Sequence, residues 1–469
     1  MTIEHLIQII YLISSALFIL GLRGLNSPVT ARRGMFMAEI GMALAIIGTL
    51  LNHEIIRYEW IIAGMIVGSL IGAAISIWTP MTHMPQRTAL SHAFGALAAT
   101  LVGVAEYYTF GTELGTVKMA AIGLEVMLGS LTFTGSLMAF AKLQELMRGS
   151  PITYPGQNFF NIGLLTAIVG TTIYLVFDPT ASGLFYLMVG MGLVFGVLLV
   201  LPIGAADMPV VIALLNSYAG LAASATGFAL SNNILIIAGT LDGASGLILS
   251  ILMCRAMNRS ILNVLFGAFG KVAAPSGAAA APAAAADGNL KVKQVTIEQA
   301  VALFQKAKSV IIVPGYGMAA AQAQHGVREF ADLLKARGTT VKYAIHPVAG
   351  RMPGHMNVLL AEANVPYDAL IDMDDINPEF PNADVALVMG ANDVTNPAAR
   401  HDQKSPIYGM PILDVDKAKT VIVCKRSMNP GFAGIDNELY VQPHTYMLFG
   451  DAKSTAQKLA EAMKQTVSA

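Results

Sequence analysis

Long apolar runs fill the first half of the chain, whereas short apolar runs separated by polar segments fill the second half. A bilayer core about 30 Å thick is crossed by roughly 20 apolar residues in a helix. By this measure the first half contains nine predicted membrane spans. They are residues 3–22, 35–52, 60–78, 88–109, 119–140, 159–177, 184–201, 208–229 and 233–254.

The second half has the pattern of alternating strands and helices. Short apolar runs at 309–313, 341–345, 385–389 and 420–424 predict buried strands, and residues 318–337 predict a helix after the first of them. Strands separated by helical segments indicate a parallel, doubly wound sheet, whose ligand binds at the carboxyl ends of the strands. The predicted fold is therefore a polytopic α-helical membrane bundle followed by a soluble α/β Rossmann-like doubly wound domain.

An Ala-rich stretch with Pro275 and Pro282 separates the two halves and is typical of a tether. We expect a transmembrane domain at 1–265, a linker at 266–293 and a soluble domain at 294–469. The first span has no basic segment before it and no small-residue cleavage site, so we expect it to be retained rather than removed as a signal peptide.

Composition supports a membrane protein and excludes some partners. Hydrophobic residues make up 55% of the chain and charged residues 13%, and the mean hydropathy is +0.59. The net charge of −1 argues against a nucleic-acid partner, because no basic surplus neutralises phosphates. Cys254 and Cys424 lie in different halves, and no His/Cys/Asp/Glu cluster has ligand spacing, so neither a disulfide nor a metal is expected.

Basic residues in the short loops predict the orientation. With nine spans the termini lie on opposite sides, and the positive-inside rule assigns the more basic side to the cytoplasm. The N-terminus is then outside and the soluble domain is cytoplasmic. Arg23, Arg32, Arg33, Arg87, Lys142, Arg148, Arg255 and Arg259 fall on one side, against Arg57 and Lys118 on the other.

Polar residues within the spans are candidates for a conduction path. An ionisable group in a span costs at least about 2.5 kcal/mol, so it normally faces a cavity or a partner. His92 can exchange a proton near neutral pH; a structural, hydrogen-bonded histidine is an equally open interpretation. Stripes of small residues around these groups indicate close helix packing. The candidates are His92, Glu106, Glu125, Asp207 and Asp242, with Asn216, Asn232 and Asn233 as neutral relays.

Three loops at predicted strand ends suit phosphate binding. Gly315-x-Gly317-x-x-Ala320 follows the first strand and matches the dinucleotide fingerprint, in which a helix N-terminus offers unpaired N–H groups to a pyrophosphate. The second strand is followed by Arg351 and by no carboxylate, which favours a 2′-phosphate and hence NADP(H). Lys425-Arg426-Ser427 supplies two cations and a hydroxyl.

A fourth loop, residues 390–394, also follows a strand. Its Asp393 has no basic neighbour in sequence, so we predict that this carboxylate titrates with the redox state of a cofactor.

The motifs closely resemble those of the β subunit of proton-translocating NAD(P) transhydrogenase. They are Pro-Gly-Tyr-Gly-Met-Ala at 314–319, His-Pro-Val-Ala-Gly-Arg-Met-Pro-Gly-His-Met-Asn at 346–357, Gly-Ala-Asn-Asp at 390–393, Lys-Arg-Ser-Met at 425–428, Gly-Ala-Ala-Asp-Met-Pro-Val-Val at 204–211 and Leu-Leu-Asn-Ser-Tyr at 214–218. The resemblance covers essentially the whole chain.

The resemblance implies a bacterial inner-membrane enzyme. It would couple Si-specific/Re-specific hydride transfer between NAD(H) and NADP(H) to proton translocation. This chain would bind NADP(H), in reversed orientation relative to ordinary Rossmann proteins. An α subunit of one or two chains would bind NAD(H), and αβ units would pair as a dimer in membrane lipid.

The resemblance also implies roles for individual residues. His92, Asn232 and Asp207 would serve proton translocation. Lys425, Arg426 and Ser427 would hold the 2′-phosphate, and the loop ending at Phe432 would form a lid, although Phe432 stands where tyrosine is expected in many relatives. The full expected cofactor site is Gly315, Tyr316, Gly317, Val348, Ala349, Gly350, Arg351, Met352, Pro353, Gly390, Ala391, Asn392, Asp393, Val394, Gly409, Met410, Lys425, Arg426, Ser427, Met428, Asn429, Pro430, Gly431, Phe432, Asp451 and Ala452.

Two other functional classes compete with this interpretation. In one, a channel or transporter is gated by a domain that senses NADP(H) without oxidising it. In the other, a membrane reductase passes electrons through haem or flavin; it is disfavoured because His92 is the only histidine deep within a predicted span and cannot provide paired axial ligands.

Overall fold

The computed structural model describes residues 3–51, 58–80, 83–111, 114–147, 151–204, 207–257, 260–261, 264, 292–352, 354–403, 405, 407–431 and 433–467. The chain divides into two compact units, one formed by Met1–Gly204 with Val211–Ser250 and the other by Ala205–Val210 with Ile251–Ala469. Each unit is described by itself. Most of the predicted linker lies outside the described residues, and the predicted boundaries stay predictions.

Nine helices in the described residues are long and apolar enough to cross a membrane, which confirms all nine predicted spans. Several extend beyond the apolar run, because helical hydrogen bonding continues into polar residues outside the hydrocarbon. The second helix, for example, starts with Pro28 in its first turn, where a missing N–H costs nothing. The helices are α1 (Ile3–Gly24), α2 (Pro28–Leu50), α3 (Glu59–Trp78), α4 (Met84–Phe110), α5 (Thr116–Leu143), α6 (Gln157–Phe177), α7 (Ser182–Val200), α8 (Met208–Ala229) and α9 (Asn233–Ala256).

The orientation of these helices across the membrane stays a prediction. Arg57, Arg148 and Arg259, which contributed to it, lie outside the described residues.

Small residues bring α8 and α9 into backbone contact. A Cβ atom at position 220 would lie 2.3 Å from the Gly243 nitrogen, and one at position 239 would lie 2.4 Å from the Ser224 nitrogen. Ser217 Oγ also donates a hydrogen bond of 2.7 Å to the Gly243 carbonyl. The small-residue stripes therefore serve close packing, as expected where dispersion and hydrogen bonds hold helices together in lipid.

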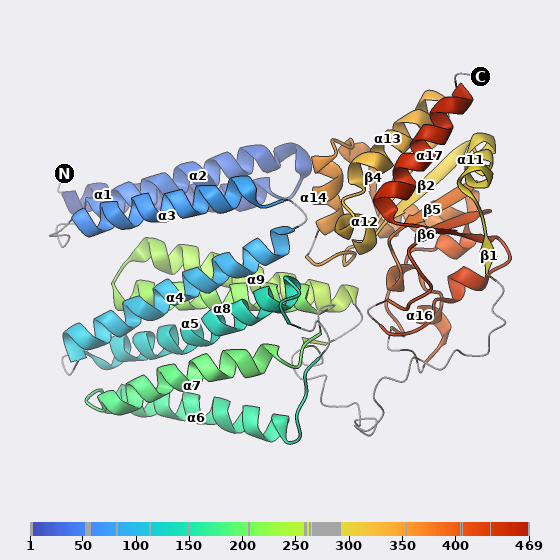
Figure 1. Ribbon diagram of the computed structural model, residues 1–469. Helices are drawn as coiled ribbons and strands as arrows, with labels where there is room; N and C mark the ends of the chain where they lie inside the picture. Colours follow the sequence, from blue (N-terminus) through green and yellow to red (C-terminus); the bar gives the residue numbers. More distant parts are fainter. Residues whose placement is uncertain are drawn as a thin grey trace. The chain divides into compact units, whose positions relative to one another are not determined.

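Helix α5 packs against several neighbours and has many buried residues (Figure 1). Its Glu125 is fully buried, lies beside Gly103 of α4 and accepts a hydrogen bond of 2.7 Å from Thr226 Oγ1 of α8. Thr134 Oγ1 donates 2.7 Å to the Leu193 carbonyl of α7. Polar side chains on α5 thus find protein partners on three different helices.

A buried lysine binds the carbonyl groups at the C-terminal end of α7. Lys142, on α5, is 1% exposed, and its Nζ donates to the carbonyls of Val200 (3.1 Å), Leu201 (2.6 Å) and Ile203 (2.7 Å). The last carbonyls of a helix have no partner within the helix. The ammonium group supplies one and also offsets the negative end of the helix dipole.

The second unit contains a seven-stranded sheet in which every pairing is parallel, as predicted. The strand order is β1-β7-β6-β5-β2-β3-β4. Strands β2, β3, β5 and β6 match the four predicted runs within one residue at each end. The strands are β1 (Lys293–Gln294), β2 (Ser309–Pro314), β3 (Thr340–Ile345), β4 (Leu370–Asp372), β5 (Val385–Met389), β6 (Val421–Lys425) and β7 (Thr445–Phe449).

Side chains of each strand alternate between two apolar cores. In β2, Val310 and Ile312 join the core beneath α11 (Ile297–Lys306), α13 (Gln324–Ala336), α14 (His355–Glu362) and α17 (Ala452–Val467) (Figure 1). Ile311 and Val313 join the opposite core, to which short helices contribute. These are α15 (Met373–Ile376), η5 (Asn377–Asn382), η6 (Asp393–Thr395), η7 (Val415–Lys417) and η8 (Glu438–Val441). Of the other short helices, η4 (Tyr367–Ala369) contributes to the first core and α16 (Ala398–His401) to a small separate cluster.

The helix predicted at 318–337 is in fact two helices, α12 (Tyr316–Ala320) and α13. Gln322 adopts φ +50°, and Ala323 N–H bonds back to the Met318 carbonyl at 3.0 Å, which ends the first helix. Strands β1, β4 and β7 were not predicted. The first two contain only two and three residues, too few to show a hydrophobic period.

We predict that Lys142→Met destabilises the membrane unit. Three buried carbonyls would lose their donor, and the free energy of unfolding should fall by roughly 3 kcal/mol. Thermal denaturation of the detergent-solubilised protein measures this as a lower Tm. The matched control is Lys118→Met on the same helix, where the lysine is exposed; equal losses in both variants would contradict the assignment.

Candidate functional site

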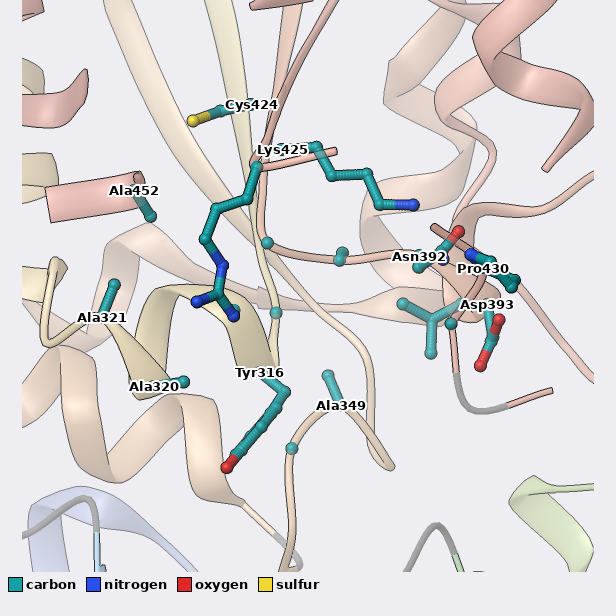
Figure 2. A pocket seen from close by; sticks show the side chains of 18 of the residues that line it. Tyr316, Ala320, Ala321, Ala349, Asn392, Asp393, Cys424, Lys425, Pro430 and Ala452 are labelled. Carbon is teal, nitrogen blue, oxygen red and sulfur yellow. The ribbon is translucent and has the colours of Figure 1, made fainter. Parts of the chain in front are cut away.

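The direction of chain winding reverses between β2 and β5. Strand β2 pairs with β3 on one side and with β5 on the other. In doubly wound sheets the loops that leave such neighbouring strands diverge and open a crevice for ligands. The loops after β2, β5 and β6 all line one pocket at this edge of the sheet (Figure 2).

Two of these loops touch backbone to backbone. A Cβ atom at position 315 would lie 2.4 Å from Ala391 Cα, and one at position 317 would lie 2.8 Å from Gly390 Cα. Gly390 itself has φ +73°. Glycine is required at these points, because side chains would push the loops apart and close the pocket between them.

The fingerprint loop differs from the expectation in its hydrogen bonding. Gly315 N–H donates to the Met389 carbonyl (3.0 Å) and Gly317 N–H donates to the Gly390 carbonyl (2.9 Å). The expectation of a row of unpaired amides is therefore wrong for these two groups. Their hydrogen bonds hold the β2 and β5 loops together instead.

The loop after β6 carries the positive charge. Lys425 extends toward Asn392 (Figure 2), and its Nζ donates 2.5 Å to the Asn429 carbonyl and lies 4.9 Å from the centre of the Tyr440 ring. Burial lowers the pKa of Lys425, whereas Asp393 and Asp436 act in the opposite direction. Arg426 and Ser427, in contrast, are exposed.

Side chains from η8 and its N-cap fix the β5 loop. Asn392 Oδ1 accepts hydrogen bonds from Tyr440 Oη (2.7 Å) and Asn437 Nδ2 (3.1 Å). Asp393 Oδ2 accepts 3.1 Å from Ala433 N–H. Sequence showed no basic residue next to Asp393, but the fold brings Lys425 within its electrostatic reach. Titration of Asp393 with a cofactor's redox state stays a prediction.

The loop after β3 contains two neutral histidines. His346 Nδ1 accepts from Val348 N–H (3.2 Å), so its Nε2 carries the proton and donates to the Pro411 carbonyl (2.9 Å). His355 Nδ1 accepts from Arg351 N–H (3.0 Å). Burial lowers the pKa of His346 to about 4, and burial together with Arg351 lowers the pKa of His355 to about 4.

The guanidinium of Arg351 turns away from solvent and onto an aromatic ring. It lies 4.2 Å from the centre of the Tyr316 ring, and Arg351 is 7% exposed. This stacking joins the β3 loop to the β2 loop.

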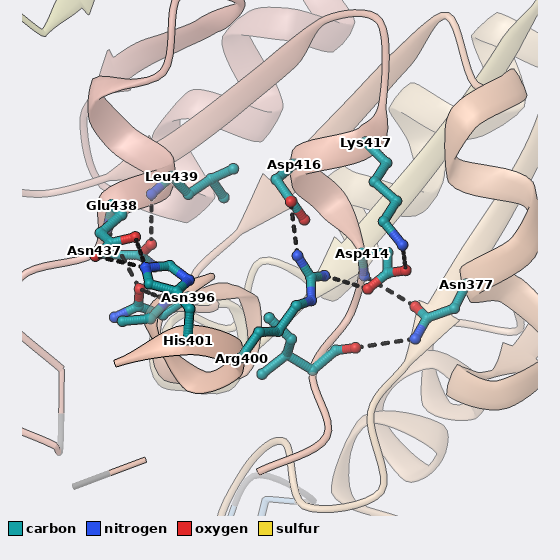
Figure 3. A network of polar contacts seen from close by, with 12 residues as sticks. Asn377, Asn396, Arg400, His401, Asp414, Asp416, Lys417, Asn437, Glu438 and Leu439 are labelled. Carbon is teal, nitrogen blue, oxygen red and sulfur yellow. Dashed lines mark hydrogen bonds and ion pairs between the residues drawn. The ribbon is translucent and has the colours of Figure 1, made fainter. Parts of the chain in front are cut away.

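An ion-pair network anchors a further wall (Figure 3). Arg400 binds Asp414 and Asp416, the latter at 2.7 Å, and Lys417 binds Asp414 at 2.5 Å. Asn377 joins the network by accepting from Asp414 N–H at 2.9 Å. The network fixes both ends of segment 398–417, which includes Gly409 and Met410 of the predicted site.

Most predicted cofactor residues line this pocket. Arg351, Met352, Gly409 and Met428 do not, and Pro353 and Phe432 lie outside the described residues. Asp451 lines the pocket, but its Oδ1 also caps α17 by accepting from Lys453 and Ser454 N–H. The predicted residues that line it are Gly315, Tyr316, Gly317, Val348, Ala349, Gly350, Gly390, Ala391, Asn392, Asp393, Val394, Met410, Lys425, Arg426, Ser427, Asn429, Pro430, Gly431, Asp451 and Ala452.

Seven further lining residues were not predicted: Pro209, Met253, Met257, Ala320, Ala321, Cys424 and Gly450. Ala320 had a signal, because it is the last position of the fingerprint. Cys424 and Gly450 directly precede predicted site residues. Burial raises the pKa of the Cys424 thiol to about 11, so it is protonated and unsuited to act as a nucleophile. The lining suits binding and orientation rather than covalent catalysis.

The membrane residues predicted to act together do not gather at one point. Asn232 Oδ1 caps α9 by accepting from Ile234 and Leu235 N–H at 3.1 and 3.3 Å. Asp207 directly precedes α8, so the two residues flank opposite ends of a 22-residue helix about 33 Å long. Their predicted roles in proton translocation stay predictions.

His92 lies at a different depth from Asn232. Gln86 of α4 donates a hydrogen bond to the Leu143 carbonyl of α5, and Thr100 of α4 packs against Gly129 of α5. The two helices therefore run antiparallel, and His92 lies at about the same depth as Ser136. Gly135 in turn packs against Leu215 of α8. The neighbouring Asn216 is therefore the candidate relay at the depth of His92.

Comparison with known proteins bears on this site. A sequence model of the family described as NAD(P) transhydrogenase beta subunit matches residues 7–462. Two sequences from Rhodospirillum rubrum, each named NAD(P) transhydrogenase subunit beta, are 50% identical over 462 residues. Each match covers 97% of this chain and 98% of the relative.

We predict that the second unit loses stability below neutral pH. His346 and His355 have pKa values of about 4 when folded and 6.5 when unfolded, so the unfolded state binds more protons as the pH falls through 6.5 toward 4. At pH 5 each should cost about 2 kcal/mol relative to pH 7.5. Calorimetry across this range should show the loss, and His355→Asn, which retains an acceptor for Arg351 N–H, should halve it. An unchanged pH dependence in that variant would contradict the assignment.

Proposed function

Since the chain belongs to the NAD(P) transhydrogenase beta subunit family, we propose that it binds NADP(H) in its second unit and couples hydride transfer with NAD(H) to proton translocation through its first. It is a membrane protein that acts with an α subunit. In this proposal the α subunit binds NAD(H). The bound nicotinamides supply the hydride chemistry, and this chain contributes binding and orientation.

The observation that carries the cofactor proposal is the pocket at the β2/β5 switch point. Part of its surface consists of backbone atoms, because a side chain at Gly315, Gly317 or Gly390 would collide with the facing loop. A flat, extended ligand such as a dinucleotide can lie closely against a backbone surface of this kind.

The distribution of charge supports a specific role for the β6 loop. The fingerprint amides of Gly315 and Gly317 are already bonded, so they are poor candidates for holding a phosphate. Arg426 and Ser427 are exposed donors on the β6 loop, which lines the same pocket. With Lys425 they would hold the 2′-phosphate by charge-assisted hydrogen bonds. This arrangement agrees with the reversed cofactor orientation that the family resemblance implies.

The contacts of the β6 loop support a lid. Lys425 binds the Asn429 carbonyl, and Asp393 binds Ala433 N–H. Between them, a Cβ atom at position 431 would lie 2.5 Å from Asp393 Oδ1. Gly431 and Ala433 therefore lie against the β5 loop, and we propose that the β6 loop opens and closes over the cofactor.

For the membrane unit we propose that His92 takes up and releases the translocated proton. Its Nδ1 is buried and makes no hydrogen bond to the part of the chain that the structure describes. A structural histidine would normally be bonded at this depth. Protonation would change which conformation of the helices is favoured, and NADP(H) would alternate between occluded and exchanging states.

We further propose a bacterial inner-membrane location with the N-terminus outside and the second unit in the cytoplasm. The basic-residue asymmetry supports this orientation. One or two α chains and a dimer of αβ units complete the proposed enzyme.

We predict that Lys425→Ala with Arg426→Ala weakens NADP(H) binding at least tenfold and leaves NAD(H) binding to the αβ enzyme unchanged, because the two cofactors differ by the 2′-phosphate. Equilibrium binding of each nucleotide measures the difference. Lys458→Ala, an exposed lysine on α17, is the charge-matched control. Equal losses for both cofactors would refute the phosphate assignment.

We predict that His92→Ala abolishes proton pumping in vesicles while NADP(H) binding persists, because the relay group is lost and the pocket is intact. Fluorescence quenching of a pH probe during transhydrogenation measures pumping. His83→Asn, an exposed histidine just before the same helix, should pump normally. Pumping that survives in His92→Ala would sink the relay proposal.

A further inference from the structure

A carboxylate lies near the middle of α9 without an explanation in the proposed function. Asp242 is the tenth residue of a 24-residue helix and is exposed in the single chain. A charged group at such a depth costs about 2.5–3.5 kcal/mol if it faces lipid. It must therefore face a water-lined or protein-lined space, and it needs a polar partner.

The structure provides that partner on α8. Asn216 Nδ2 donates a hydrogen bond of 3.1 Å to Asp242 Oδ1. The two helices are held in register here by Ser217 Oγ, which donates to the Gly243 carbonyl, and by the contact of Gly246 with Ser217. The carboxylate is thus fixed by the residue beside it on the facing helix.

Asn216 also lies at about the same depth in the membrane unit as His92. This follows from the contacts that α5 makes with α4 on one side and with α8 on the other. The hydrogen bond to Asn216 places Asp242 near this depth too, within electrostatic reach of His92. The other titratable or charged side chains on these four helices are Arg87, Glu106, Tyr107 and Tyr108 on α4, Lys118, Glu125 and Lys142 on α5, Tyr218 on α8, and Cys254 and Arg255 on α9.

Two of these groups are committed elsewhere. Lys142 is bonded to three carbonyls at the end of α7, and Glu125 is bonded to Thr226. Glu125 also lies beside Gly103, about three helical turns along α4 from His92, whereas Asp242 lies near the depth of His92.

We propose that Asp242, held by Asn216, is a positioning residue that stabilises the protonated form of His92 and so sets the pH at which the enzyme takes up its proton. The inference rests on the proposed role of His92. Two opposite charges in a medium of low dielectric attract strongly, so the carboxylate favours the imidazolium over the neutral ring. The neutral Asn216 fixes the carboxylate without adding charge.

The test compares pH profiles of proton pumping by the αβ enzyme in vesicles. Asp242→Asn removes the charge and retains an acceptor for Asn216, and Asp242→Val removes both. The midpoint of the profile should move to lower pH by about half a unit or more in each neutral variant, whereas Asp242→Glu should stay near the wild-type value. Binding of NADPH to the solubilised enzyme should be unchanged and reports assembly.

Glu39→Gln is the matched control, since Glu39 is an exposed carboxylate within another membrane helix, α2. It should leave the midpoint in place. An unchanged midpoint in whichever neutral Asp242 variant assembles, or an equal shift in Glu39→Gln, would overturn the inference. Wild-type enzyme that shows no pumping at all would instead refute the proposed function, so the two failures are distinguishable.

Discussion

Hydrocarbon offers no hydrogen-bond partner, so every polar group in the membrane unit must find one within the protein or face water. This constraint explains much of the unit. Lys142 closes the end of α7, Glu125 binds Thr226, and Ser217 binds a carbonyl of α9. His92 is one of several buried side chains in this unit with a polar atom that makes no hydrogen bond to any described residue. Among them its ring is the group that exchanges a proton near neutral pH, and the proposed proton relay rests on both properties.

The second unit is governed by a different constraint, the contact of two backbone loops at the switch point. Gly315, Gly317 and Gly390 bring the loops after β2 and β5 together, and the basic side chains of the pocket lie on the loop after β6. Close backbone approach and positive charge are thus supplied by different loops. Such a division suits a ligand with a flat body and a phosphate group.

The sequence predicted the architecture well, because continuous apolar runs report burial directly. The nine spans and the four central strands followed from the lengths of these runs. Strand β4 and the break at Gln322 did not, because three residues or one left-handed φ leave no periodic signal. Motif positions located most of the pocket. Contacts between side chains could not be predicted from the sequence. The capping role of Asn232 and the approach of Lys425 to Asp393 both depend on the fold.

The central claim is that proton binding in the membrane unit is thermodynamically linked to NADP(H) binding in the other unit, and linkage is reciprocal. Calorimetric titration of the αβ enzyme with NADPH, in buffers that differ in ionisation enthalpy, counts the protons exchanged on binding. The account predicts a net proton exchange in the wild type that disappears in His92→Asn. The same number of protons in both proteins would contradict it.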